Sequence, residues 1–243
     1  SDFGASYGGH GGVWECPDLF ELPVDGDPGQ TRWVLLSNNY SNTLRSGGTQ
    51  YFIGTFDGRE FRCETPESLT RWLDKGRNHY AAVTWDNAPD GRRVLLAWMA
   101  GWPYQDEERP VQIRGIQSVP RDLALYSHGG TVYLAAKPAV EMESLRGEEA
   151  LKCPKFRLRG SRTFPLPGNG LCEVLVTFRD PAAAAAGFRL KNSLGEELVA
   201  RYDIAGKRFV LDFSKSGRVD YSRDPNARSV VTLDPKPEAL KPG

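Results

Sequence analysis

The chain has 243 residues and a mass of 27.0 kDa, which is enough to bury a core in one large or two small domains. Basic and acidic residues both number 31, and this zero net charge argues against nucleic acid or an anionic membrane surface as the partner. The charged fraction of 26% and the mean hydropathy of −0.47 are those of an ordinary soluble globular protein, and no apolar run approaches the ~18 residues of a membrane helix.

Composition predicts a mostly β protein, because 26 glycines and 17 prolines supply turns and aromatic residues make up 11% of the chain. The four cysteines are far apart, with no C-x-x-C pair, and the three histidines show no H-x-x-x-H spacing. We therefore expect no metal site and no cofactor. The cysteines are interpreted as buried or half-exposed thiols, with a Cys153–Cys172 bridge left open.

Strand-like runs recur at short intervals in the first part of the chain. Each is rich in β-branched, aromatic or aliphatic residues and ends at turn residues such as Asp57-Gly58, Asp90-Gly91 and Gly129-Gly130. The predicted strands are Arg32–Asn38, Thr49–Phe56, Tyr80–Asp86, Arg93–Ala100, Ile113–Leu125 and Thr131–Lys137. Many short, evenly spaced strands indicate a propeller, barrel or sandwich, and only Pro66–Leu73 reads as a helical turn.

The charged segment Glu141–Leu151 is predicted to be a short helix or a linker. Strands resume after it, and the set resembles half of a β-sandwich. The predicted strands are Leu171–Phe178, Gly187–Lys191, Glu197–Tyr202 and Arg208–Phe213. The tail Asp234–Gly243 is rich in Pro and Lys and is expected to fray.

The segment Gly11–Phe20, with the sequence GGVWECPDLF, carries the clearest chemical signal. Glu15 stands between Trp14 and Cys16, and a carboxyl packed beside an indole and a thiol is expected to be partly desolvated. Desolvation raises a carboxyl pKa and keeps a proton available for a leaving oxygen, as a general acid requires. The alternative is a glutamate at a strand end beside a turn.

Four further stretches follow W-E-C-P-D-L-F in order. They are GGTQYFIGTF at Gly47–Phe56, LDKGRNHYA at Leu73–Ala81, LAWMAGW at Leu96–Trp102 and RGIQSVPRDLAL at Arg114–Leu125. Together they resemble the motifs of the invertase, levanase and inulinase family, the glycoside hydrolases that cleave β-fructofuranosides. The resemblance implies an all-β fold, a five-bladed β-propeller followed by a β-sandwich. It also implies retaining hydrolysis by two carboxylates about 5–5.5 Å apart.

Matched residue by residue, the resemblance makes Glu15 the general acid/base. Trp98 matches the tryptophan that helps floor the fructose subsite, although a buried propeller tryptophan is an equally ordinary reading. Asp74 and Tyr80 match residues near the acid/base and the sugar, and Asp74 alternatively closes a turn before Gly76. Gln50 and Tyr51 are expected to be structural, and Arg121 is expected to pair inside the propeller.

The family's nucleophile motif, N-D-P-N-G, does not occur in this sequence. Its R-D-P motif should precede W-E-C-P, but the two R-D-P strings here, at Arg179–Pro181 and Arg223–Pro225, lie in the second region and are interpreted as coincidental. About 125 residues match the propeller, whereas five blades of roughly 40–60 residues need well over 200. We therefore expect a segment that lacks the N-terminal part of the enzyme.

The expected organisation is a C-terminal portion of the propeller over residues 1–140, a linker over 141–151 and an incomplete β-sandwich over 152–243. A partial propeller leaves open strand edges, so a complementary chain or an oligomer is expected to cover them.

One functional hypothesis is a glycoside hydrolase that releases terminal fructose from fructans or sucrose, with this chain carrying the acid/base half of the site and inactive alone. The alternative is a non-catalytic sugar-binding or assembly module. Both have a fructose-containing saccharide as partner. The polar, Gly-rich segment Ser1–Gly12 is no export signal, yet extracellular or periplasmic location is favoured over cytoplasmic because many such enzymes are exported.

Overall fold

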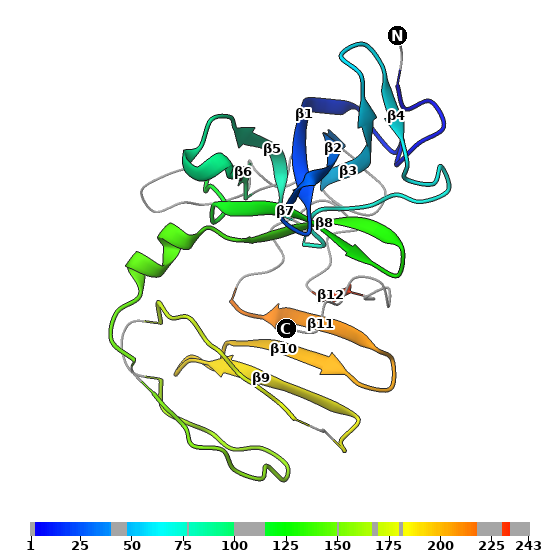
Figure 1. Ribbon diagram of the computed structural model, residues 1–243. Coiled ribbons are helices and arrows are strands. Elements are labelled where there is room, and N and C mark those ends of the chain that lie inside the picture. Colours follow the sequence, from blue (N-terminus) through cyan, green and yellow to red (C-terminus); the bar gives the residue numbers. More distant parts are fainter. Residues whose placement is uncertain are drawn as a thin grey trace.

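A computed structural model describes residues 3–39, 48–76, 78–99, 115–149, 151–166, 170–179, 182–217 and 230–233. These residues form an eight-stranded sheet, a four-stranded sheet and two short 3-10 helices (Figure 1). Within the described ranges, no helix combines the length and the apolar character that crossing a membrane requires. All four cysteines are free thiols.

The first part of the eight-stranded sheet is an antiparallel meander. Its strands are β1 (Trp14–Val24), β2 (Asp27–Asn39), β3 (Gly48–Phe56) and β4 (Phe61–Cys63), and each pairs with the next. The hairpin between β1 and β2 turns at Asp25 and Gly26, where φ is 54° and 78°. The predicted Asp57-Gly58 turn separates β3 from β4.

The second part repeats this pattern. Its strands are β5 (Tyr80–Trp85), β6 (Arg93–Trp98), β7 (Arg121–His128) and β8 (Thr131–Pro138), with the 3-10 helix η1 (Pro89–Gly91) between β5 and β6. A single parallel bridge between Val24 and Leu125 joins the two meanders into one sheet.

The first strands of the two meanders also contact each other directly. The Asp18 carboxylate on β1 accepts hydrogen bonds from the Thr84 backbone N–H at 2.9 Å and from its hydroxyl at 2.6 Å. The two meanders are thus neighbouring four-stranded blades whose first strands lie side by side. This arrangement confirms the predicted partial β-propeller, and the sheets of the described residues do not close into a ring.

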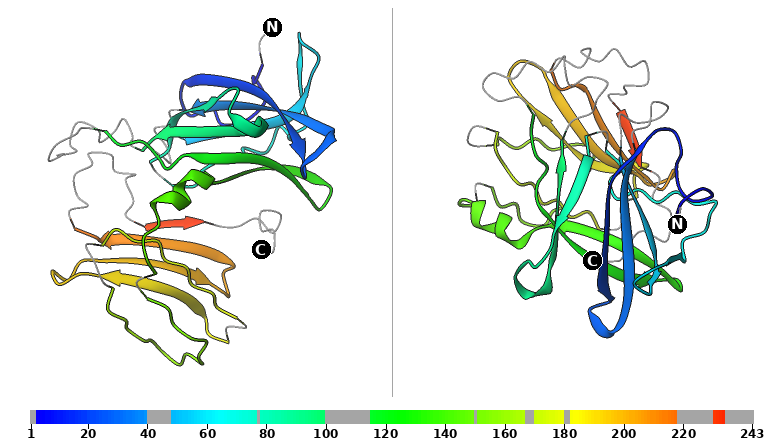
Figure 2. Two further views of the ribbon diagram at one scale, coloured as in Figure 1. Left: turned by 60° about the vertical axis from the view of Figure 1, so that its left-hand side comes forward. Right: turned by 90° about the horizontal axis from the view of Figure 1, so that it is seen from above.

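After β8, the 3-10 helix η2 (Val140–Leu145) leads away from the blades. The four-stranded sheet follows as a separate body in Figure 2, with the strands β9 (Ala185–Lys191), β10 (Glu197–Asp203), β11 (Arg208–Lys215) and β12 (Val230–Leu233). This antiparallel sheet is the predicted half of a β-sandwich. The division at residues 140 and 151 into domain, linker and domain stays a prediction.

The apolar core lies almost entirely in the two blades. Phe20 and Leu36 of the first blade and Leu95 and Leu125 of the second are at most 2% exposed and belong to one cluster. Strands such as β3 read as continuous buried runs because both faces are covered. In the four-stranded sheet, the described apolar side chain that is fully buried is Val210.

Several strand predictions were wrong in detail. Over Ile113–Leu125, the described residues before Arg121 form only an isolated bridge, between Gln117 and Trp98, and the strand begins at Arg121. Leu171–Phe178 is exposed, and none of its residues belongs to a strand. Pro66–Leu73 makes one turn at Leu69 and then extends, and Trp72 pairs with Gln50.

Three strands were not predicted at all: β1, β4 and β12. The prolines of β1 and the shortness of β4 hid the alternation that marks a strand. Asp234–Gly243 and the second R-D-P string, for which predictions were made, lie outside the described residues, as do parts of the LAWMAGW and RGIQSVPRDLAL motifs.

Candidate active site

Glu15 is the second residue of β1 and its side chain is exposed. Immediately after it, the register of β1 against β2 shifts between Glu15 and Asp18, and Cys16 takes a φ of 48°. A bulge of this kind re-aims the neighbouring side chains. Glu15 therefore lies at the start of the first strand of its blade, just before this irregularity, and is the register partner of Asn38 on β2.

Trp14 does not cover Glu15. Its indole N–H donates to the Gly9 carbonyl at 2.8 Å, and its ring stacks on Phe52 with the centroids 5.5 Å apart. The expectation of a carboxyl desolvated between an indole and a thiol is therefore wrong. The indole packs against the first blade, and Cys16 is itself exposed.

Tyr80, which the family resemblance places near the acid/base, contacts Glu15 directly. The Tyr80 hydroxyl donates a hydrogen bond to Glu15 Oε2, although the two residues are 65 positions apart. Tyr80 is the first residue of β5 and is buried. The contact joins the beginnings of β1 and β5, and so brings together two of the four site residues predicted from the sequence.

Trp98 lies beside this pair. It is the register partner of Tyr80 across β5 and β6, so both residues stand at the same position along the second blade. Its side chain is half-buried and borders a cavity of about 350 Å³, which Trp85, Leu96 and Gln117 also line. An indole edge at such a hollow is a suitable platform for the C–H face of a sugar.

Asp74 is held inside the protein. One carboxylate oxygen accepts the Gly76 N–H at 2.6 Å, and the other pairs with the Arg121 guanidinium at 2.7 Å. Burial is the largest single effect and raises the Asp74 pKa, but the Arg121 hydrogen bond and charge, the nearby His79 ring and the Gly76 N–H together hold the pKa below its usual value. The predicted internal pairing of Arg121 is confirmed, and the Gly76 contact is the turn-closing role foreseen for Asp74.

A buried polar network lies behind Tyr80. Asn38 on β2 binds both backbone groups of Ala82, donating to its C=O at 3.0 Å and accepting from its N–H at 2.9 Å. The Thr49 hydroxyl on β3 lies 2.8 Å from Asn38 Oδ1 and 3.1 Å from His79 Nδ1. Sequence reasoning missed this network, although the polar Ser-Asn-Asn end of an otherwise apolar strand was a signal for it.

His79 is the titratable member of that network. It is 1% exposed, and burial is the largest effect on its pKa, which falls from 6.5 to about 4. The Asp74 carboxylate opposes this shift and Arg121 adds to it. The imidazole is consequently neutral at pH 7.

The segment before β1 packs across the face of the first blade. Gln50 accepts the Gly9 N–H at 2.9 Å, and Asn39 donates to the Gly9 carbonyl. Both side chains are fully buried, and Tyr51 is 6% exposed, which supports the structural role predicted for Gln50 and Tyr51. These contacts fix the approach of the chain to Trp14 and Glu15.

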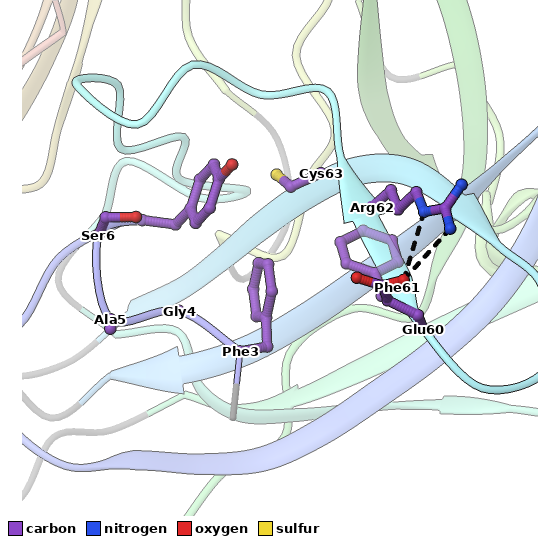
Figure 3. A pocket seen from close by; sticks show the side chains of 9 residues that line it. Phe3, Gly4, Ala5, Ser6, Glu60, Phe61, Arg62 and Cys63 are labelled. Atoms are coloured by element: carbon purple, nitrogen blue, oxygen red, sulfur yellow. Dashed lines mark hydrogen bonds and ion pairs between the residues drawn. The ribbon is translucent and has the colours of Figure 1, made fainter. Parts of the chain in front are cut away.

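A second cavity lies elsewhere. It measures about 420 Å³ and lies between residues 3–7 and 60–63, as Figure 3 shows. The rings of Phe3 and Phe61 meet edge to face in it, and Arg62 pairs with Glu60 at 3.3 Å. Because β4 forms the opposite edge of the first blade from β1, this cavity is separate from Glu15. Within the described ranges no group of three or more metal-ligating side chains comes together.

Comparisons with known proteins agree with this architecture. Residues 1–138 match the model of the glycosyl hydrolases family 32 N-terminal domain. The chain is 38% identical over 224 residues to a levanase of Bacillus subtilis, covering 89% of this chain and 33% of that protein. It is 32% identical over 238 residues to the extracellular exo-inulinase inuE of Aspergillus niger, covering 91% of this chain and 43% of that protein.

The crystal structure of an exo-inulinase from Aspergillus awamori superposes with a TM-score of 0.75 at 28% identity, covering 96% of this chain and 46% of that one. A β-fructofuranosidase from Schwanniomyces occidentalis shares the fold with a TM-score of 0.72 at 22% identity, covering 93% and 47%. The chain thus spans between a third and a half of the length of these relatives. With more than half of its residues matched by the family model, the chain belongs to family 32 of the glycosyl hydrolases.

Proposed function

We propose that this chain carries the general acid/base of a retaining hydrolase that releases terminal β-fructofuranose from fructans or sucrose. Glu15 protonates the leaving oxygen in the first step and activates water in the second. The observation that carries this proposal is the hydrogen bond from the Tyr80 hydroxyl to Glu15 at the point where the two blades meet. It shows an exposed carboxylate held in place by a buried partner.

The chemistry explains why such a partner is useful. A general acid must hold its proton at one place relative to the leaving oxygen, and an exposed glutamate otherwise samples several rotamers. The Tyr80 hydroxyl fixes one carboxylate oxygen and leaves the other free to exchange a proton with substrate or water. Tyr80 is itself rigid because it is buried.

We propose that Trp98 forms part of the floor of the fructose subsite, next to Tyr80. For Asp74, the contacts with Gly76 and Arg121 favour the turn-closing role, and a direct hydrogen bond to a sugar hydroxyl is the second role proposed. The substrate class follows the names of the relatives, a levanase and exo-inulinases. An extracellular or periplasmic location is proposed because the Aspergillus niger relative is named extracellular.

Retaining hydrolysis needs a nucleophilic carboxylate as well, and the family's N-D-P-N-G motif does not occur in these 243 residues. We therefore propose that the nucleophile comes from residues outside this sequence. A complementary chain or an oligomer that covers the open edges of the two blades is proposed on the same ground.

The decisive experiment compares Glu15→Gln with the parent in the longest natural polypeptide that contains these residues. The expected loss is about 10²–10⁴-fold in kcat on levan, inulin and sucrose. The loss should be much smaller on an aryl fructoside, whose leaving group needs no proton, and azide should restore turnover. Glu21→Gln, another exposed carboxylate of β1, is the matched control and should leave the rate unchanged.

An unchanged rate in Glu15→Gln would refute the acid/base assignment. The 243-residue chain by itself is expected to release no fructose. The alternative, a sugar-binding module, is tested by calorimetry of the 243-residue chain with levan oligomers. Such a module predicts saturable binding, with no fructose released by this chain or by the longest natural polypeptide.

A further inference from the structure

We propose that His79 is a positioning residue, whose Nδ1–H anchors the start of β5 on Thr49 and thereby holds the Tyr80 hydroxyl on Glu15. The inference rests on the proposed function, since it concerns the same carboxylate. It starts from Asn38, whose amide orientation is fixed by chemistry. The Ala82 N–H needs an acceptor and the Ala82 C=O needs a donor, so Asn38 must present Oδ1 to the first and Nδ2 to the second.

The direction of the remaining bonds follows. Asn38 Oδ1 can only accept, so the Thr49 hydroxyl donates its hydrogen to it across 2.8 Å. The Thr49 oxygen then has only lone pairs left for His79 Nδ1, 3.1 Å away. His79 must therefore carry a hydrogen on Nδ1 and donate it to Thr49.

The other ring nitrogen of His79, Nε2, makes no comparable hydrogen bond in the described part of the chain. Nε2 of His79 is buried and has no hydrogen-bond partner among the described residues. In the neutral Nδ1–H tautomer it carries a lone pair, whereas a proton there would leave a buried N–H donor unsatisfied. The arrangement suits a neutral ring with a single anchoring bond, and it does not suit a proton shuttle.

The backbone shows why an anchor is needed at this place. Ala81 has a φ of 50°, and the register of β5 against β6 shifts between Tyr80 and Val83. A non-glycine residue at positive φ persists where its surroundings enforce it. His79 fastens the residue before this irregularity and Asn38 fastens the residue after it, so Tyr80 is aimed at Glu15 by contacts on both sides.

The test uses three variants in the longest natural polypeptide. His79→Phe keeps a ring and removes the donor, His79→Asn keeps an N–H where Nδ1 stands, and His79→Gln moves the N–H toward Nε2. We expect His79→Phe and His79→Gln to lower kcat about tenfold with little change in KM, and to shift the pH-rate profile in the same direction as Tyr80→Phe. His79→Asn should recover most of the rate.

Coupling to Tyr80 separates positioning from general destabilisation. The double variant His79→Phe, Tyr80→Phe should be no slower than Tyr80→Phe alone. The inference would be overturned if the rate losses of His79→Phe and Tyr80→Phe multiplied in the double variant, or if His79→Asn were as slow as His79→Phe. In either case, an inactive Glu15→Gln would still uphold the proposed function. ¹⁵N NMR of the imidazole in the 243-residue chain tests the anchor apart from activity, with a proton expected on Nδ1. A neutral ring protonated on Nε2 would overturn the inference as well.

Discussion

The two blades and the four-stranded sheet differ in how they are stabilised. Among the described residues, the buried apolar side chains lie between Phe20 and Ala139, in the region of the blades, with one exception. The exception is Val210 in the later sheet. The blades also contain the buried polar network around Asn38. This difference indicates that the candidate site is built on the blades, which have their own apolar core, and that the later sheet adds little to the stability of the site. All six tryptophans of the sequence precede residue 103, so tryptophan fluorescence reports on the first part of the chain and not on the later sheet.

The largest effect is expected from removing core volume in the blades. Phe20→Ala should lower the free energy of unfolding by about 3–5 kcal/mol, because the ring is 1% exposed and leaves a cavity. Urea unfolding followed by tryptophan fluorescence measures it. Leu211→Ala in the later sheet is the control. It should change the free energy of unfolding measured in this way by no more than about 0.5 kcal/mol, because Leu211 is 38% exposed. Equal losses would break the comparison.

The next effect is a pH dependence confined to the blades. The His79 pKa is about 4 when folded and 6.5 ordinarily, so the unfolded chain binds more protons between these values. The stabilisation is fully present above pH 6.5 and is lost as the pH falls to 4, by about 3 kcal/mol. Urea midpoints across this range measure the loss. His79→Phe should flatten this part of the profile, and an unchanged slope in the variant would contradict the assignment.

A smaller loss is expected when the link between the blades is cut. Asn38→Ala leaves the Ala82 N–H and C=O and the Thr49 hydroxyl without their partner, and we expect a loss of about 2 kcal/mol in the free energy of unfolding. Gln30→Ala on the exposed end of the same strand is the matched control and should be near neutral. Equal fluorescence-detected urea curves for the two variants would show that the network adds no stability.

The smallest effect concerns the junction after the blades. Arg92 pairs with Asp122 on β7 at 2.7 Å and with Glu141 on η2 at 2.6 Å, and the hydrogen bond from Arg92 lowers the Glu141 pKa to about 2. This stabilisation is present above pH 4.5 and disappears as the pH falls toward 2. Arg92→Ala should lower the thermal midpoint slightly at low salt and not at about 1 M salt, where such pairs are screened. Arg59→Ala, an exposed loop arginine, is the control, and a loss that persists at high salt would refute the assignment.

Much of the fold was predictable because most of its strands carry local signals. β3, β6 and β8 are short apolar runs between turn residues, and periodicity identifies such runs directly. β1 was missed because its two prolines and its bulge break the alternation. Leu171–Phe178 was predicted to be a strand from a similar apolar run, but its residues are exposed and lie outside every strand, so the local pattern alone does not decide the structure.

The sequence by itself determined the all-β class, the family resemblance and the identity of Glu15 as the candidate acid/base, since these depend on composition and on residues close together in the chain. Only the tertiary structure decided that Glu15 is exposed, that Tyr80 contacts it and that Asp74 is held by Arg121. These contacts join residues 47 to 65 positions apart. The Tyr80–Glu15 contact forms only where the first strands of two blades meet, and the Asp74–Arg121 contact joins the segment before β5 to the start of β7. The buried network of Asn38, Thr49 and His79 has the same origin, because burial and hydrogen-bond direction are properties of the packed molecule.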